Sequence, residues 1–199
     1  MKNRILYWLF LGLLISCTHL PKPADSTEVS AINDCFLNIV DTFGYRYHTL
    51  RPSLQDSTFS KPDSLTIGVF DQLLNVSEWQ KSILTVLNTL PDSTLKKSFI
   101  DLFKKSRRDT AQEKLNPSSI TNTGKYLVSA VDDRDTKHIR HAIGMIAFSR
   151  VYYDNTSNIA LLVAEIRGNT FKSGVDKLFL LKKSGKGWIK AVDFDLEIW

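Results

Sequence analysis

The apolar positions in the first half of the chain recur with a helical period. One stripe runs between residues 27 and 44, where Gly44 supplies a stop signal; its members are Val29, Ile32, Phe36, Ile39, Val40 and Phe43. A second stripe follows Ser77 and contains Trp79, Ile83, Val86, Leu87 and Leu90. A third stripe follows Pro91 and contains Leu95, Phe99, Leu102 and Phe103. The pattern predicts three amphipathic helices, and we expect a further short helix over the apolar stretch 65–76.

The second half changes to the period of two that is typical of strands. Strand candidates lie at residues 126–131, 145–153, 159–167, 175–182 and 188–199. In the last of these, apolar and acidic residues alternate, with Val192, Phe194, Leu196 and Ile198 on one face. Polar and glycine-containing turns separate the candidates. The sequence therefore predicts an α+β fold, in which N-terminal helices pack on the apolar face of a C-terminal antiparallel meander of four to five strands.

The first residues have the pattern of an export signal. Lys2 and Arg4 precede an apolar run over residues 5–15, which is shorter than the ~20 residues that a bilayer span needs. The run ends in Leu14-Ile15-Ser16-Cys17, which resembles the lipobox of bacterial lipoproteins. This resemblance implies cleavage before Cys17 and attachment of acyl chains to it, so that the protein contacts the membrane through a lipid anchor. An ordinary cleaved signal peptide with a nearby cysteine is the alternative.

The lipoprotein interpretation divides the chain into a signal peptide (1–16), a tether (17–26) and one domain (27–199). Thr18 stands where aspartate is associated with retention in the inner membrane, so we expect an outer-membrane location, facing either the periplasm or the surface. The composition of the 199 residues, with 43% hydrophobic residues, fits one globular domain. Without Lys2 and Arg4 the net charge falls from +5 to +3, which gives no indication of a nucleic-acid partner.

The last third of the chain resembles a known module. The similarity lies in three segments, Phe148-Ser149-Arg150-Val151-Tyr152-Tyr153, Ala160-Leu161-Leu162-Val163 and the run from Leu180 to Ile189. These are similar to the FSRVxF, ALVYV and LLEKxxGxW motifs of a lipoprotein family of the Bacteroides group. The resemblance implies a β meander behind a lipid anchor and no particular activity. At residues 168–171 this chain has Gly-Asn-Thr-Phe in place of the family's cysteine-bearing turn.

Few residues indicate catalytic chemistry. His138 and His141, downstream of Asp132, could ligate zinc, but in a strand this spacing directs the two imidazoles to opposite faces. Cys35 lies beside an apolar stripe, as a small core residue does. The chain has no phosphate-binding glycine loop or nucleophile elbow. We therefore expect no cofactor or metal, and a non-catalytic binding or structural module of the cell envelope, with an envelope protein as a further partner. A hydrolase-type envelope enzyme with a site near His138 and His141 is the alternative.

Overall fold

The elements of the fold follow the order of the chain, with most helices before most strands. The structure, a computed structural model, describes residues 22–24, 26–50, 65–106, 113–132, 142–168, 174–185 and 187–198, and for residues 22, 23, 42–50, 106 and 113 the backbone alone. The helices are α2 (Ser26–Leu50), α3 (Gln80–Asn88), α4 (Ser93–Ser106) and the 3-10 helix η2 (Pro117–Ser119). The strands are β1 (Lys22–Pro23), β2 (Leu65–Phe70), β3 (Glu113–Lys114), β4 (Tyr126–Val131), β5 (Ala142–Phe148), β6 (Tyr152–Asp154), β7 (Ile159–Gly168), β8 (Gly174–Ser184) and β9 (Gly187–Ile198).

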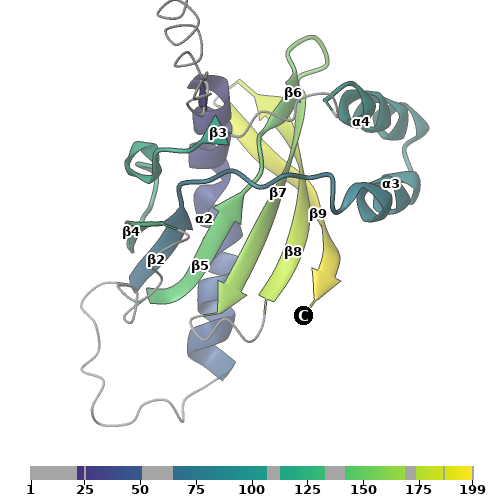
Figure 1. The fold of residues 1–199 in the computed structure, drawn as a ribbon. Coiled ribbons are helices and arrows are strands. Elements are labelled where there is room, and N and C mark those ends of the chain that lie inside the picture. Colours follow the sequence, from purple (N-terminus) through teal and green to yellow (C-terminus); the bar gives the residue numbers. More distant parts are fainter. Residues whose placement is uncertain are drawn as a thin grey trace, which may run out of the picture.

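The main sheet is mixed. Its strand order is β4-β2-β5-β7-β8-β9, with β6 paired to β7 (Figure 1). From β5 onward the neighbours are antiparallel, which confirms the C-terminal meander. However, β2 is parallel to both β4 and β5. The α+β class and the N-terminal position of the helices are therefore confirmed, whereas the predicted four to five strands are wrong: in the described residues the sheet has seven.

One additional strand arises because the predicted strand 145–153 is divided into β5 and β6, and the other comes from a segment that the sequence assigned to a helix. Within residues 65–76 the predicted short helix is wrong, because Leu65–Phe70 forms β2. This run contains the β-branched residues Thr66, Ile67 and Val69, and its last four residues are buried. A strand that is covered on both faces has a continuous apolar run instead of an alternation, and periodicity alone does not separate such a strand from a buried helix.

The three predicted amphipathic helices are present, with different ends. Helix α2 continues through Gly44 to Leu50, since an internal glycine weakens a helix by only about 1 kcal/mol relative to alanine and need not end it. Asp92 caps α4: its Oδ1 accepts the N–H groups of Thr94 at 2.9 Å and Leu95 at 3.0 Å. The capping contacts explain why α4 begins immediately after the break at Pro91.

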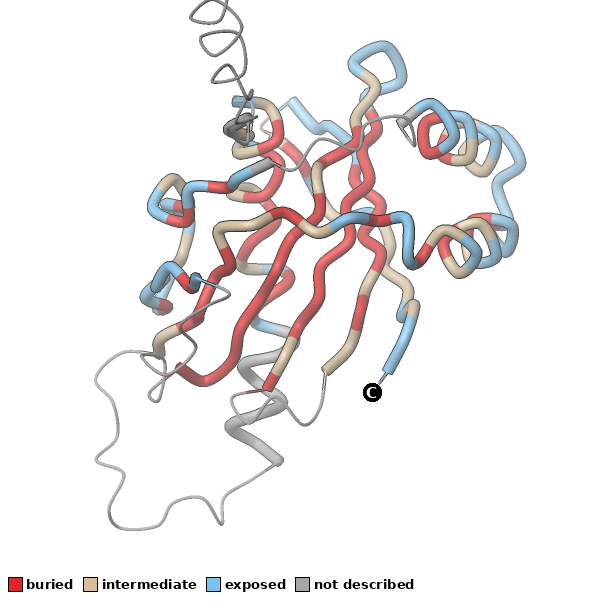
Figure 2. Tube along the Cα trace, in the orientation of Figure 1, coloured by how far each residue is buried: buried red, intermediate tan, exposed pale blue. Residues whose placement is uncertain are grey.

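Helices cover both faces of the sheet. Along β7, Ala160, Leu162 and Ala164 belong to a core formed with α2, which we call the first core. Leu161 and Val163 point to the other face and belong to a second core formed with α3 and α4. In Figure 2 the middle strands are buried along most of their length. The fold therefore has three layers over much of the sheet, whereas the sequence predicted helices over a single apolar face.

The C-terminal strand is part of this arrangement. Strand β9 pairs with β8 over most of its length, and Val192, Phe194 and Leu196 pack against the second core while remaining partly exposed. These three residues lie on one face of β9, as the sequence predicted. Ile198 differs, because it is 74% exposed. The burial of this strand is thus smaller than its clean alternation indicated.

Helix α2 is joined to the start of β9 by polar contacts. Asp34 Oδ2 accepts the Trp188 N–H at 2.9 Å, and the Cys35 thiol donates to the Trp188 carbonyl at 3.8 Å. Burial, followed by the neighbouring Asp34 carboxylate, raises the pKa of Cys35 to about 12. Cys35 is fully buried in the first core, which confirms its prediction as a core residue.

We expect the substitution Gly187→Ala to lower the free energy of unfolding by about 1–3 kcal/mol. Gly187 has φ +136°, and an added Cβ would lie 2.5 Å from Asp34 Oδ2, the acceptor of the Trp188 N–H. Gly185 in the same turn is the control, because a Cβ there meets nothing within 4 Å. Urea titrations of both variants measure the difference. A Gly187→Ala protein as stable as Gly185→Ala would contradict the close approach of α2 to this turn.

Candidate functional site

The residues that the sequence singled out for chemistry lie outside the described part of the chain. These are Cys17 of the lipobox, and His138 and His141 of the alternative enzyme site. Among the residues that are described, no group of three or more histidine, cysteine, aspartate or glutamate side chains could hold a metal ion. Within that same part, no helix has the length and apolar character to cross a membrane. The candidate site is therefore sought in the hollows of the described surface.

Residues 22–24, the first that the structure describes, are hydrogen-bonded to the rest of the domain. Strand β1 pairs in parallel with β3, and the Ala24 N–H donates to the Lys114 carbonyl at 3.0 Å. Lys114 in turn forms an ion pair with Asp71 at 2.9 Å. Residues 22–24 thus belong to the folded body, although the sequence placed them in the tether. In the chain, the first described strand, β1, directly precedes α2.

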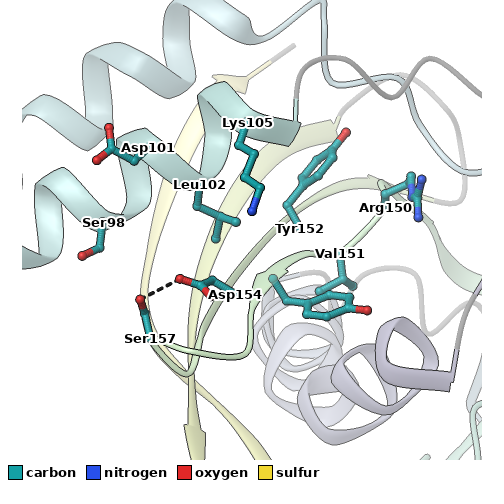
Figure 3. Close-up of a pocket in the computed structure, with 10 residues that line it drawn as sticks. Ser98, Asp101, Leu102, Lys105, Arg150, Val151, Tyr152, Asp154 and Ser157 are labelled. Atoms are coloured by element: carbon teal, nitrogen blue, oxygen red, sulfur yellow. Dashed lines mark hydrogen bonds between the residues drawn. The ribbon is translucent and has the colours of Figure 1, made fainter.

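The larger hollow lies between α4 and β6 (Figure 3). Its volume of about 640 Å³ falls in the range of about 300–1,000 Å³ that small-molecule sites occupy. We call it the α4–β6 pocket, lined by Ser98, Asp101, Leu102, Lys105, Arg150, Val151, Tyr152, Tyr153, Asp154 and Ser157. The described lining thus combines two tyrosines, two serine hydroxyls and four charged groups.

One wall of the α4–β6 pocket is a single face of α4. Ser98, Asp101 and Lys105 are spaced three and four residues apart, so they lie on the same side of the helix. Leu102, on this face too, is 6% exposed and belongs to the second core, which fixes the rotation of the helix about its axis. In Figure 3 the Lys105 side chain extends from α4 toward the residues of β6. Neither Asp101 nor Lys105 forms an ion pair with a described residue.

The opposite wall is β6 and the turn that follows it. Asp154 Oδ2 accepts the Ser157 hydroxyl at 2.7 Å, and its Oδ1 accepts the Thr156 N–H at 2.9 Å. These hydrogen bonds, the one from Ser157 first, hold the pKa of the Asp154 carboxyl below its usual value. Asp154 is therefore a fixed negative charge at neutral pH, held in place by its own turn.

A buried ion pair connects the pocket to the start of α2. Glu28, in the first turn of α2, is 1% exposed, and its Oε1 accepts from Arg150 Nε at 3.0 Å. The same oxygen accepts the Val151 N–H at 3.2 Å. Arg150 is 17% exposed and lines the pocket. Removal of either charge would leave the other in a mostly desolvated position, so the pair fixes the pocket floor relative to α2.

The arrangement places charged, polar and aromatic groups around one hollow. The lining holds two cations, Lys105 and Arg150, and two carboxylates, Asp101 and Asp154. Among these described lining residues there is no histidine or cysteine, and the Ser157 hydroxyl donates to Asp154 Oδ2. Such a site offers donors, acceptors and aromatic surface to a small polar ligand.

A second hollow of about 370 Å³ lies where residues 74–79 cross the sheet. Glu165 of β7 and Asp176 of β8 face each other directly in the sheet register. The Trp79 indole N–H donates to Asp176 Oδ2 at 2.9 Å, and Arg167 forms an ion pair with Glu165. These contacts join the crossing segment to the sheet. We therefore assign the buried carboxylates of this hollow a structural role.

The sequence analysis missed the residues of both hollows. Arg150 and Tyr152 entered it only through the family resemblance, and Glu28 was not considered. Glu165 offered a usable signal, because a carboxylate within the apolar run of β7 is costly to bury and so indicates a specific partner. Lys105 belongs to the basic run at residues 104–108, which could indicate a phosphate or lipid head group, but cations are usual at a helix C-terminus and Asp101 dilutes the charge.

Comparison of the chain with protein-family models, with curated proteins and with solved structures found no match. The function is therefore argued from the sequence of the chain and the geometry of its pockets alone.

Proposed function

We propose that this protein is a lipid-anchored, non-catalytic binding module of the cell envelope, with the α4–β6 pocket as its ligand site. The observation that carries the proposal is the ion pair between Glu28 and Arg150, which joins the pocket to the helix that follows the anchor segment. The membrane is the first partner, and an envelope protein is a second.

The anchor is supported by the order of residues at the start of the chain. The sequence Leu14-Ile15-Ser16-Cys17 ends an apolar run, and the first described residues, Lys22–Pro23, come five positions after Cys17. Two or three acyl chains on Cys17 would give stable attachment, because each buried CH₂ contributes about 0.8 kcal/mol. From Cys17 to Lys22 the extended chain spans about 17 Å, so the domain would lie close to the bilayer. Thr18 favours the outer membrane.

A binding role is supported by the composition of the pocket. Charges of both signs, hydroxyls and two tyrosines converge there. An envelope hydrolase with a site near His138 and His141 is the competing proposal. It predicts activity that His138→Ala or His141→Ala abolishes, whereas a binding module retains ligand binding in both variants.

Substitution of Cys17 by serine is expected to abolish lipid attachment. In cells fed a fatty-acid analogue, the wild-type protein should become labelled and partition into the detergent phase. The Cys17→Ser protein should remain unlabelled, because a serine hydroxyl does not form the thioether. Cys35→Ala is the matched control, since Cys35 is buried in the first core and should have no effect on labelling. An unlabelled wild type, or equal labelling of Cys17→Ser, would reject the anchor.

A further inference from the structure

The turn between β8 and β9 presents exposed cations beside an exposed apolar side chain. Lys182 and Lys183 precede the turn, and both are exposed and form no ion pair with a described residue. Ile189 lies directly opposite Lys182 in the β8–β9 register and is 52% exposed, whereas most large apolar side chains of the described sheet are buried. We call this surface, residues 182–185 and 187–189, the β8–β9 tip. It combines cationic and apolar groups, as surfaces that contact lipid do.

The last turn of α4 adds two more lysines nearby. Lys104 and Lys105 are exposed, and neither forms an ion pair with a described residue. Lys105 lines the α4–β6 pocket together with Ser157, and the Lys183 N–H donates to the carbonyl of the next residue, Asn158, at 2.8 Å. Both pairs of lysines therefore lie close to the β6–β7 turn.

The described carboxylates at this end are fewer and mostly less exposed. Asp34 accepts the Trp188 N–H at 2.9 Å, and Asp154 accepts the Ser157 hydroxyl at 2.7 Å. Both carboxylates are only partly exposed, whereas Asp101 on α4 is exposed. Four exposed lysines therefore face solvent at this end with one exposed carboxylate among them.

The opposite end of the same strands is acidic. Glu165, Asp176 and Glu197 lie in one row across β7, β8 and β9, each directly opposite the next in the register. Arg167 forms an ion pair with Glu165, but carboxylates outnumber cations in the lining of the hollow beside this row. The described charges are thus separated along the strands. A protein with this distribution turns its basic end toward an anionic surface.

The proposed anchor attaches at the basic end. Glu28, in the first turn of α2, bonds to Arg150 just before β6, and Asp34 bonds to the Trp188 N–H, so the first turns of α2 lie beside the β8–β9 tip (Figure 1). Cys17 is five positions before β1, which directly precedes α2. Five extended residues span only about 17 Å. A lipid on Cys17 would therefore hold this end of the domain near the bilayer.

We propose that the β8–β9 tip rests on the surface of an anionic bilayer, with Lys182 and Lys183 on lipid phosphates and Ile189 at the boundary of the headgroup region. This inference rests on the proposed anchor, which brings the tip to the membrane. Each lysine near such a surface strengthens the attraction about fivefold, the factor that corresponds to about 1 kcal/mol. A bilayer accommodates Ile189 without a matching pocket, which is why we favour it over an acidic protein partner.

Chemical protection of lysines tests this orientation in the anchored protein. The wild-type lipoprotein is reconstituted in phosphatidylglycerol or phosphatidylcholine vesicles and treated with an uncharged amine reagent, and mass spectrometry gives the modification rate at each lysine. We expect Lys182 and Lys183 to react roughly fivefold more slowly in the anionic vesicles, and 1 M salt to remove this protection. Lys81, which follows the Trp79–Asp176 contact, and Lys125, at the start of β4, are away from the tip and should react equally in both vesicles.

A matched pair of variants tests the apolar contact. Ile189→Ser should reduce the protection of Lys182 and Lys183 at least twofold, whereas Leu127→Ser, at a 56% exposed position of β4, should leave it unchanged. Equal rates at Lys182 and Lys183 in the two kinds of vesicle would overturn the proposal, as would equal protection in anionic vesicles at Lys81. Fatty-acid labelling at Cys17 would still succeed in either case, so failure of the tip is distinguishable from failure of the anchor.

Discussion

Replacement of Glu28 by alanine is expected to lower the free energy of unfolding by about 3–5 kcal/mol. Glu28 is 1% exposed, and one of its oxygens accepts hydrogen bonds from both Arg150 Nε and the Val151 N–H. The substitution removes the carboxylate but leaves the Arg150 charge, which is 17% exposed, and a buried N–H group behind. A loss of this size is a large share of the ~5–15 kcal/mol that stabilises a typical domain.

The Glu28→Gln variant provides the control for this experiment. Glutamine retains an acceptor for the Val151 N–H and has nearly the same volume, so it separates the lost charge from the lost hydrogen bond. Urea unfolding of the two variants should place Glu28→Gln between the wild type and Glu28→Ala. A loss below about 1 kcal/mol in Glu28→Ala would show that the ion pair contributes no more than an exposed one does.

Alanine at Phe36 and alanine at Phe99 are each expected to destabilise the protein by about 3–5 kcal/mol. Phe36 on α2 and Phe99 on α4 are both fully buried, but they pack against opposite faces of the sheet. A sheet with one covered face would show a large effect from one helix only. Equal losses would therefore demonstrate that both layers of helices are required.

Thermal and urea unfolding of the two phenylalanine variants give the measurement. Ser30→Ala, at an exposed position of α2, is the control for helix propensity and should change stability by no more than about 0.5 kcal/mol. Since Phe36 and Phe99 lie in separate cores, the double variant should show nearly additive losses. A Phe99→Ala protein with the stability of Ser30→Ala would contradict the packing of α4 on the sheet.

The amphipathic helices and strand β9 were predictable because each exposes one side to solvent. The stripe from Leu95 to Phe103 and the alternation from Val192 to Leu196 both record such a boundary between core and water. Strand β2 has no such boundary. The apolar run Leu65–Phe70 is enclosed by two strands and by cover on its faces, so its periodicity contains no information about its conformation.

The candidate site was less predictable than the fold. Glu28, Asp101 and Arg150 come from three distant parts of the chain, and only the packing of α2 and α4 on opposite faces brings them to one end of the sheet. The positions of single charged residues in a sequence do not show which of them will meet. By contrast, the predicted Cys17 anchor depends on a local sequence pattern, the lipobox. Enzymes recognise this pattern in an extended chain, so it can be read from the sequence without knowledge of the fold.

The parallel pairing of β2 determines when this protein can complete its fold. Leu65 pairs with Tyr126 and Thr66 with Ala142, so β2 has no strand partner until much later parts of the chain are present. The hairpins among β7, β8 and β9 close over short turns and can form early, whereas the two long loop closures on either side of β2 are slow. Until they close, the apolar residues of β2 are exposed and prone to aggregation. A chain that has been synthesised only as far as residue 125 therefore leaves β2 without either of its strand partners.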